Sequence, residues 1–278
     1  MLVAIPLIMG RMLHHEPSAP VGTLAGMCAD AVIRSKANQE LKRVGAALAG
    51  RERDLLVLEG DRLVDEARTA GLVLELVLVS EAREERAVEL ERAGLPVRRV
   101  DPALMDRVSA LVTSPGVLAL GRRTDEGTAL ELAPDALVLV VAGVADPGNL
   151  GALARSAEAA GASALCVLDG GASPWNPKAL RGSAGSLLRL AVRRFPDVAA
   201  CTAALGGTRH VRAATRGAVP LADFDWSGPV AIWVGSETGE LPAACDPFEG
   251  VSIPMRGRVE SLNVTVAASL LLYASGRA

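Results

Sequence analysis

The stretch ALVLVVAGVADPGNLGALARSAEAAGA, residues 136–162, decides the fold class of this 278-residue chain. Its first part, 136–144, is apolar without alternation, which is the pattern of a strand buried on both faces of a sheet. A Pro147-Gly148 turn and an alanine-rich segment follow, and Asn149 is a residue type that caps helices. The stretch therefore predicts a strand, a turn and a helix capped by Asn149, which is the repeating unit of an α/β fold.

Glycines between a strand and a helix raise the question of a phosphate-binding loop. A dinucleotide-binding loop needs the pattern G-x-G-x-x-G, and here only Gly148 and Gly151 are present. A Walker loop would need Lys followed by Ser or Thr after its last glycine, and that pair is missing. The glycines instead permit close approach of a ligand or of another backbone, and Arg155 shares a helix face with Gly151. A nucleotide-dependent oxidoreductase stays open as an alternative that a cofactor screen would test.

The composition permits a large core but predicts no global attraction to nucleic acid. Half of the residues are hydrophobic, the mean hydropathy is +0.30, aromatic residues make up 3% and the net charge is -3. A surface that binds nucleic acid would therefore be a local patch of basic residues.

The cysteines and the amino-terminal residues argue against several classes of protein. Cys28, Cys166, Cys201 and Cys245 are scattered without metal-ligand spacing, so we expect reduced thiols, a cytoplasmic protein and no metal site. The apolar start of the chain is about nine residues long, too short to span a bilayer. It also lacks a preceding basic region, so we expect neither a signal peptide nor a membrane partner.

The order of predicted elements indicates two α/β domains. Residues 1–29 show no clear period, a basic helix is predicted over 32–53, and alternating strands and helices continue to a strand at 116–123. Such alternation favours a covered parallel sheet. The acidic, turn-rich segment 124–135 is typical of a linker, so the domains are expected at 30–123 and 136–278.

Two further stretches place polar residues beside buried elements. In WVGSETGEL, 233–241, a buried strand ends at Gly235 and Ser236, where α/β sheets bind ligands. In SIPMRGRVESLNVTVAASLLLY, 252–273, a short strand and a basic loop lead to an apolar helix. Ser261 is the expected N-cap of that helix, and Asn263 is a polar residue near its start that needs hydrogen-bonding partners.

The three stretches together resemble motifs 1, 2 and 3 of the SpoU/TrmH family of RNA 2′-O-ribose methyltransferases, within the SPOUT superfamily. The resemblance implies a trefoil-knotted α/β methyltransferase domain over 136–278, which would be an exception to the rarity of threaded chains. It also implies that 30–123 is a smaller L30e-like domain that binds the RNA substrate. The cofactor would be S-adenosylmethionine, and the enzyme a homodimer with active sites built across the interface.

The resemblance carries over to particular positions. Those matching cofactor contacts are Val234, Gly235, Ser236, Ile253, Met255 and Leu262. Those matching the catalytic positions are Asn149, Arg155, Glu237, Ser261 and Asn263. In the family the position of Arg155 is proposed to accept the proton of the ribose hydroxyl, although a group that stays protonated is better suited to orient the substrate.

RNA phosphates would be held by basic side chains, since aromatic platforms for base stacking are few. The candidates are Arg34, Lys36, Lys42, Arg43, Lys178, Arg181, Arg256 and Arg258. Ribosomal RNA, 23S in particular, is favoured over transfer RNA because the substrate-binding domain is present.

The second motif departs from the family pattern. The family usually has G-S-E-G-x-G-L, whereas this chain has Gly-Ser-Glu-Thr-Gly-Glu-Leu over 235–241. The displaced glycines motivate an alternative, in which the chain is a non-catalytic RNA-binding or ribosome-assembly protein that keeps the fold.

Overall fold

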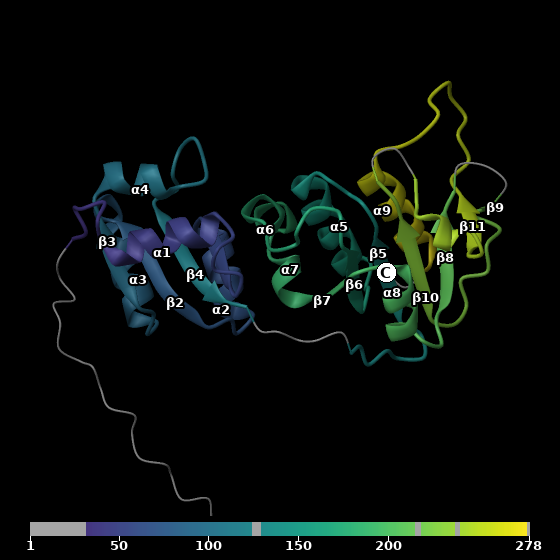
Figure 1. Ribbon diagram of the computed structural model, residues 1–278, viewed down its shortest axis with the longest axis horizontal. Helices are drawn as coiled ribbons and strands as arrows, with labels where there is room; N and C mark the ends of the chain where they lie inside the picture. Colours follow the sequence, from purple (N-terminus) through teal and green to yellow (C-terminus); the bar gives the residue numbers. More distant parts are fainter. Residues whose placement is uncertain (1–31, 124–128, 215–217, 237–239, 277–278) are drawn as a thin grey trace, which may run out of the picture. The chain divides into compact units, whose positions relative to one another are not determined.

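The computed structural model describes residues 32–123, 129–214, 218–236 and 240–276 (Figure 1). Residues 32–278 form one compact unit. The predicted amino-terminal segment 1–29 and part of the predicted linker lie outside the described residues. We use "first lobe" for residues 32–123 and "second lobe" for 129–276, because each range contains one sheet.

The first lobe is built on a four-stranded mixed sheet in the order β1-β4-β2-β3. Its strands are β1 (Leu55–Glu59), β2 (Leu74–Ser80), β3 (Val97–Val100) and β4 (Val117–Arg122). β2 pairs in parallel with β3, but β4 is antiparallel to both β1 and β2. The expectation of a wholly parallel sheet is therefore wrong here, because β4 fills the gap left between two strands that run in the same direction.

The helices of the first lobe alternate with its strands, as expected. They are α1 (Gln39–Leu48), α2 (Asp61–Thr69), α3 (Glu84–Arg92) after the 3₁₀ turn η1 (Glu81–Arg83), and α4 (Pro102–Val108). The helix expected from residue 32 begins at Gln39, because the Asn38 side chain accepts hydrogen bonds from the first turn. Ile33 instead pairs with Val100 as an isolated bridge beside β3.

The second lobe has a seven-stranded sheet in the order β7-β6-β5-β10-β8-β11-β9, and every pairing is parallel, as expected. Its strands are β5 (Leu137–Val141), β6 (Ala164–Leu168), β7 (Ala191–Phe195), β8 (Arg209–Ala213), β9 (Val219–Pro220), β10 (Val230–Val234) and β11 (Glu249–Ser252). The strand order changes direction between β5 and β10, and ligands bind at such a point in open parallel sheets.

Helices cover both faces of this sheet. They are α5 (Pro147–Ala159), α6 (Pro177–Ser183), α7 (Ser186–Arg189), α8 (Val198–Ala204), α9 (Val264–Ala274) and the 3₁₀ turn η2 (Ala243–Cys245). α6 and α7 are two helices rather than one, because Ala184 and Gly185 between them have positive φ angles of 50° and 95°.

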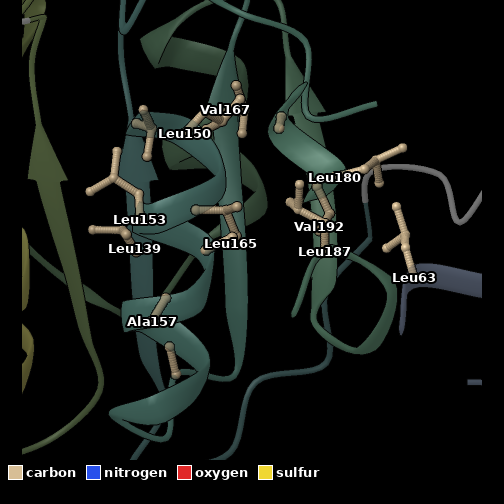
Figure 2. Packing of buried hydrophobic residues seen from close by; sticks show 14 of the residues in the cluster. Leu63, Leu139, Leu150, Leu153, Ala157, Leu165, Val167, Leu180, Leu187 and Val192 are labelled. Carbon is tan, nitrogen blue, oxygen red and sulfur yellow. The ribbon is translucent and has the colours of Figure 1, made fainter. Parts of the chain in front are cut away.

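The core of the second lobe lies mainly between the sheet and α5. Leu150, Leu153 and Ala157 of α5 are fully buried in the same cluster as Leu139 of β5 and Leu165 of β6 (Figure 2). A separate cluster on the other face of the sheet contains Phe195, Trp233 and the buried free thiols of Cys166, Cys201 and Cys245. In the described part of the chain, no helix has both the length and the apolar character that a membrane span requires.

Candidate functional site

A cavity opens beside the carboxyl ends of β10 and β11, and residues of α9 line it as well. Its volume, including the open mouth, is about 740 Å³, within the range of small-molecule sites. It is lined by Ala213, Ala214, Val234, Gly235, Ser236, Val251, Ile253, Met255, Glu260, Ser261, Leu262, Val264, Ala267 and Leu271. The structure therefore brings all six sequence-predicted cofactor positions to one cavity, which we call the β10–α9 cavity.

Backbone packing at the end of β10 shapes one wall of this cavity. A side chain on Gly235 would place its Cβ 2.3 Å from the carbonyl oxygen of Glu240, so only glycine fits. The Ser236 amide donates a hydrogen bond of 3.3 Å to the same oxygen. Ser236 and Glu240 are therefore held together at the end of β10, while Glu237 lies outside the described residues.

The other wall comes from the segment between β11 and α9. Ile253 and Met255 follow directly after β11, and Ser261 and Leu262 precede α9. Ser261 is not the N-cap that the sequence predicts: the cap is Asn263, whose side chain accepts the Thr265 amide at 2.9 Å. Ser261 is thereby left exposed at the cavity, and Asn263 does not line it.

The start of α5 also differs from the prediction. Its N-cap is Asp146, whose carboxylate accepts the Gly148 amide at 2.8 Å, and Asn149 lies within the first turn. Lys178 and the Gly148 amide both hold the pKa of Asp146 below its usual value. Pro147 at the first helical position, directly after an aspartate, is the sequence signal for this start.

Contacts between α5 and α9 join the first and third motifs. The Thr265 hydroxyl donates to the Asn149 carbonyl at 3.5 Å, and the Ser269 hydroxyl donates to Ser156 at 2.7 Å. The space that Gly151 provides on α5 is taken by α6, because a Cβ there would lie 2.3 Å from the Ala179 carbonyl oxygen. Of the two explanations for Gly151, close approach of a backbone is the one observed.

Arg155 lies on the exposed side of α5, away from the β10–α9 cavity. Within the described part of the chain it makes no hydrogen bond or ion pair with another residue. It lines a second cavity together with Arg181 and residues of the first lobe. In one chain, therefore, Ser261 reaches the β10–α9 cavity, whereas Asn149, Arg155 and Asn263 do not.

The predicted RNA-binding cations fall into two groups. Some are paired with acidic residues: Arg34 with Glu81 and Asp101, Arg43 with Glu75, Lys178 with Asp146, and Arg181 with Glu59. The others are exposed and form no ion pair with a described residue, namely Lys36, Lys42, Arg256 and Arg258. Arg256 and Arg258 are in the loop that borders the cavity.

Glu260 and the small residues Ala213 and Ala214 also line the cavity, and the three motifs do not predict them. The alanines follow from β8 lying beside β10, and only the strand order reveals that neighbour. Among the described residues, no group of three or more His, Cys, Asp or Glu side chains is arranged to hold a metal ion.

Comparison with known proteins identifies the family. Residues 136–273 match the model of the SpoU rRNA Methylase family. The chain is 31% identical to the 23S rRNA (guanosine(2553)-2′-O)-methyltransferase RlmP of Bacillus subtilis, over 87% of this chain and 97% of that protein. It is 32% identical to the 23S rRNA (guanosine-2′-O-)-methyltransferase RlmB of Xanthomonas axonopodis, over 87% and 98% of the two chains.

Solved structures agree with this result. A crystal structure of an RNA 2′-O ribose methyltransferase matches with a TM-score of 0.74 and 33% identity, covering 87% of this chain and 97% of that one. The SpoU methyltransferase AviRb of Streptomyces viridochromogenes, in complex with AdoMet, matches with a TM-score of 0.77 and 27% identity, covering 86% and 97%. The expected fold class, a knotted α/β methyltransferase domain preceded by a smaller α/β domain, is confirmed, while the L30e-like character of the first lobe stays a prediction. The chain belongs to the SpoU rRNA methylase family.

Proposed function

We propose that this protein transfers a methyl group from S-adenosylmethionine to a ribose 2′-hydroxyl of RNA, with 23S rRNA as the substrate. The observation that carries the proposal is the β10–α9 cavity, where six positions inferred from the family motifs line one space. The names of the relatives, which act on 23S rRNA, support the choice of substrate. We also propose that the protein acts in the cytoplasm, a proposal that rests on this choice of substrate.

The residues of the cavity fit the cofactor. Apolar side chains of Leu262, Val264 and Leu271 suit a flat adenine ring, and Ser236 and Glu260 offer polar groups to a ribose and an amino acid. Gly235 keeps backbone groups accessible because no side chain covers them. When bound, the cofactor supplies an electrophilic methyl group on a sulfonium.

The contribution of the protein to the reaction is alignment and control of the ribose proton. Holding the reacting groups in line can contribute about 7–11 kcal/mol to lowering the barrier. Arg155 is the residue proposed to face the ribose. Because a guanidinium group stays protonated in proteins, Arg155 acts by orienting the hydroxyl and its neighbouring phosphate, and the proton that the hydroxyl loses passes to solvent water.

We further propose a homodimer whose active sites combine residues of both chains. Two observations support it. Arg155 does not line the β10–α9 cavity of its own chain, and α9 exposes an apolar stripe of Val266, Leu270 and Tyr273 at 48%, 43% and 52%. These positions are spaced by four and three residues, so they share one helix face. Light scattering should give twice the 28.7 kDa mass of the chain, and a single-chain mass would contradict this proposal.

The test of the activity is transfer of tritiated methyl groups to an unmodified 23S rRNA transcript. We expect Arg155→Ala to reduce transfer by about 10²-fold or more with S-adenosylmethionine affinity unchanged. Arg68→Ala, an exposed arginine of α2 outside both cavities, serves as the matched control. If wild-type protein neither binds S-adenosylmethionine nor labels any RNA, the proposal is wrong.

Asn263 needs a variant that separates capping from catalysis. Asn263→Ala removes the cap of α9, and Asn263→Ser keeps a side chain that can cap. Loss of transfer in both variants, with normal thermal stability of Asn263→Ser, would assign Asn263 a role beyond the cap. Full activity of Asn263→Ser would limit it to the cap.

The departure of the second motif from its usual pattern supports one alternative, a non-catalytic RNA-binding or ribosome-assembly protein. Titration calorimetry with S-adenosylmethionine separates the two functions. Tight cofactor binding without methyl transfer to any RNA would favour the alternative.

A further inference from the structure

A second cavity, of about 910 Å³ including its open mouth, lies between the two lobes of the compact unit. It is lined by Glu59, Gly60, Asp61, Arg62, Leu63, Arg155, Arg181 and Ala184. The first five form the turn from β1 into α2 of the first lobe, and the others belong to α5, α6 and the residue after α6. Apolar packing continues beside it, where Leu63 shares a buried cluster with Leu180 and Leu187 (Figure 2). We call this space the interlobe cavity.

Three arginines face the interlobe cavity, and their donors are largely unused. Arg62 and Arg155 are exposed, and within the described part of the chain neither makes a hydrogen bond or an ion pair. Arg181 is only 26% exposed, and its Nη1 atom is buried without a hydrogen-bond partner. A buried donor without a partner is costly, so Arg181 favours an incoming acceptor.

The acidic side chains of the interlobe cavity do not cancel these charges. The Glu59 side chain, 1% exposed, accepts the Ser109 hydroxyl and the Ala110 amide and lies 3.6 Å from Arg181 Nη1, too far for a hydrogen bond. Glu59 therefore holds Arg181 at the cavity without satisfying it.

The negative charge of Asp61 is already balanced by two arginines of the first lobe. Its carboxylate accepts from Arg83 Nη1 at 2.7 Å and lies 3.0 Å from Arg86 Nε. Gly60, the residue before α2, provides no side-chain cap. The first backbone amides of α2 therefore add positive character to the side of the interlobe cavity that the first lobe forms.

We propose that the interlobe cavity binds a backbone phosphate of the RNA substrate, held by Arg62, Arg155 and Arg181. Guanidinium groups bind phosphate oxygens through paired, charge-assisted hydrogen bonds. Phosphate contacts fix the position of a nucleic acid without reading its sequence. The first lobe thereby forms the side of the interlobe cavity that lies opposite Arg155. On that side, Arg62 is the residue that positions the target strand of the RNA. The identity of the ligand as RNA rests on the proposed function.

The experiment compares Arg62→Ala with Arg68→Ala, two exposed arginines on the same helix of which only the first lines the cavity. The probes are an unmodified 23S rRNA transcript and a mixed-sequence single-stranded RNA of about 20 nucleotides, a length that spans one single-strand site, titrated at several salt concentrations. We expect Arg62→Ala to weaken binding of both RNAs at least about fivefold and to reduce the slope of log affinity against log salt by about one. Arg62→Lys should retain most of the salt slope.

The results separate this site from the proposed function. Equal RNA affinity and salt slope for Arg62→Ala and Arg68→Ala would overturn the phosphate site, even if the wild type methylates RNA. Thermal unfolding and S-adenosylmethionine affinity of Arg62→Ala should equal those of the wild type, and a loss of either would assign Arg62 a structural role instead. Failure of the wild type to methylate any RNA, together with a specific effect of Arg62→Ala on RNA binding, would reject the proposed reaction and keep the site.

Discussion

Gly235 occupies a position at the end of β10 where the backbone of Glu240 takes the space of a side chain. A methyl group there would lie 2.3 Å from the Glu240 carbonyl oxygen, and backbone cannot move aside as a flexible side chain can. We therefore expect Gly235→Ala to force the loop away from β10 and to weaken S-adenosylmethionine binding at least about tenfold, measured by titration calorimetry.

Gly206→Ala is the control for Gly235→Ala. Gly206 is exposed after α8, and a methyl group there would have the Ala203 carbonyl oxygen as its nearest neighbour, at an ordinary 3.6 Å. The control variant should leave cofactor binding unchanged. Wild-type affinity in Gly235→Ala would show that the loop does not shape the cofactor site.

Local sequence predicts where α5 and α9 begin only to within a few residues. Asp146 and Asn149 are both good N-caps, and only Pro147 favours the first. Ser261 and Asn263 compete in the same way, and no proline decides between them. The first turn of α9 also contacts α5 through the hydrogen bond from Thr265 to the Asn149 carbonyl, and capping preferences contain no such tertiary contact.

At the scale of the element, replacing two helical glycines by alanine is expected to change the free energy of unfolding in opposite directions. A Cβ on Gly151 of α5 would lie 2.3 Å from the Ala179 carbonyl oxygen and 2.8 Å from the Ser183 amide of α6, so this glycine lets the two helices approach closely. A Cβ on Gly45 of α1 would meet nothing within 4 Å. We expect Gly151→Ala to lower the free energy of unfolding by about 1–3 kcal/mol through overpacking.

Gly45→Ala should instead raise the free energy of unfolding by about 0.5–1 kcal/mol, the difference in helix propensity. Urea unfolding of both variants, followed by circular dichroism, measures the two values. Equal effects of the same sign would contradict the close crossing of α5 and α6.

The alternating hydrophobic patterns of the sequence predict most strands and helices. They do not predict the direction of a strand or the point at which a helix is interrupted. Hydrophobic pattern reports burial and predicts buried strands, yet it cannot tell that β4 runs antiparallel between β1 and β2. The apolar pattern of 176–190 likewise runs through Ala184, where the helix ends with a positive φ angle. Both features depend on how elements pack, which is information that a single segment does not carry.

At the scale of the molecule, the motifs predicted which residues gather at the β10–α9 cavity but not where Arg155 lies. Val234 ends β10, and the other cofactor positions lie directly after β10 or between β11 and α9, so one chain brings them all together. Arg155 is on the side of α5 that faces the first lobe, and a motif pattern contains nothing about that neighbour. The surroundings of Arg155 therefore depend on the first lobe, which lies outside all three motifs.

The stability of the whole molecule depends on pH through groups whose pKa differs between the folded and the unfolded chain. Burial lowers the pKa of His210, and its Nδ1 atom accepts the Trp233 indole N–H at 3.1 Å. In the unfolded chain the histidine keeps a pKa near 6.5, so below that pH the unfolded state binds more protons than the folded state. Stability contributed by neutral His210 is therefore present above pH 6.5 and is lost as the pH falls through the window below it.

Carboxylates add a second loss at lower pH. Arg189 lowers the pKa of Glu158, and Arg209 lowers that of Glu249, both from an ordinary 4.5. The stability from these ion pairs is present above pH 4.5 and is lost as the pH falls through the lowered folded-state values. Because these pairs are partly exposed, salt should weaken this second loss more than the first.

Urea unfolding between about pH 4 and pH 8, followed by tryptophan fluorescence, separates the two losses. The wild type should show constant stability above pH 7, a first decline below pH 6.5 and a steeper one below pH 4.5. His210→Asn keeps an acceptor for the Trp233 indole but cannot titrate, so it should lose the first decline and retain the second. An unchanged first decline in His210→Asn would assign that decline to another group and contradict the role of His210.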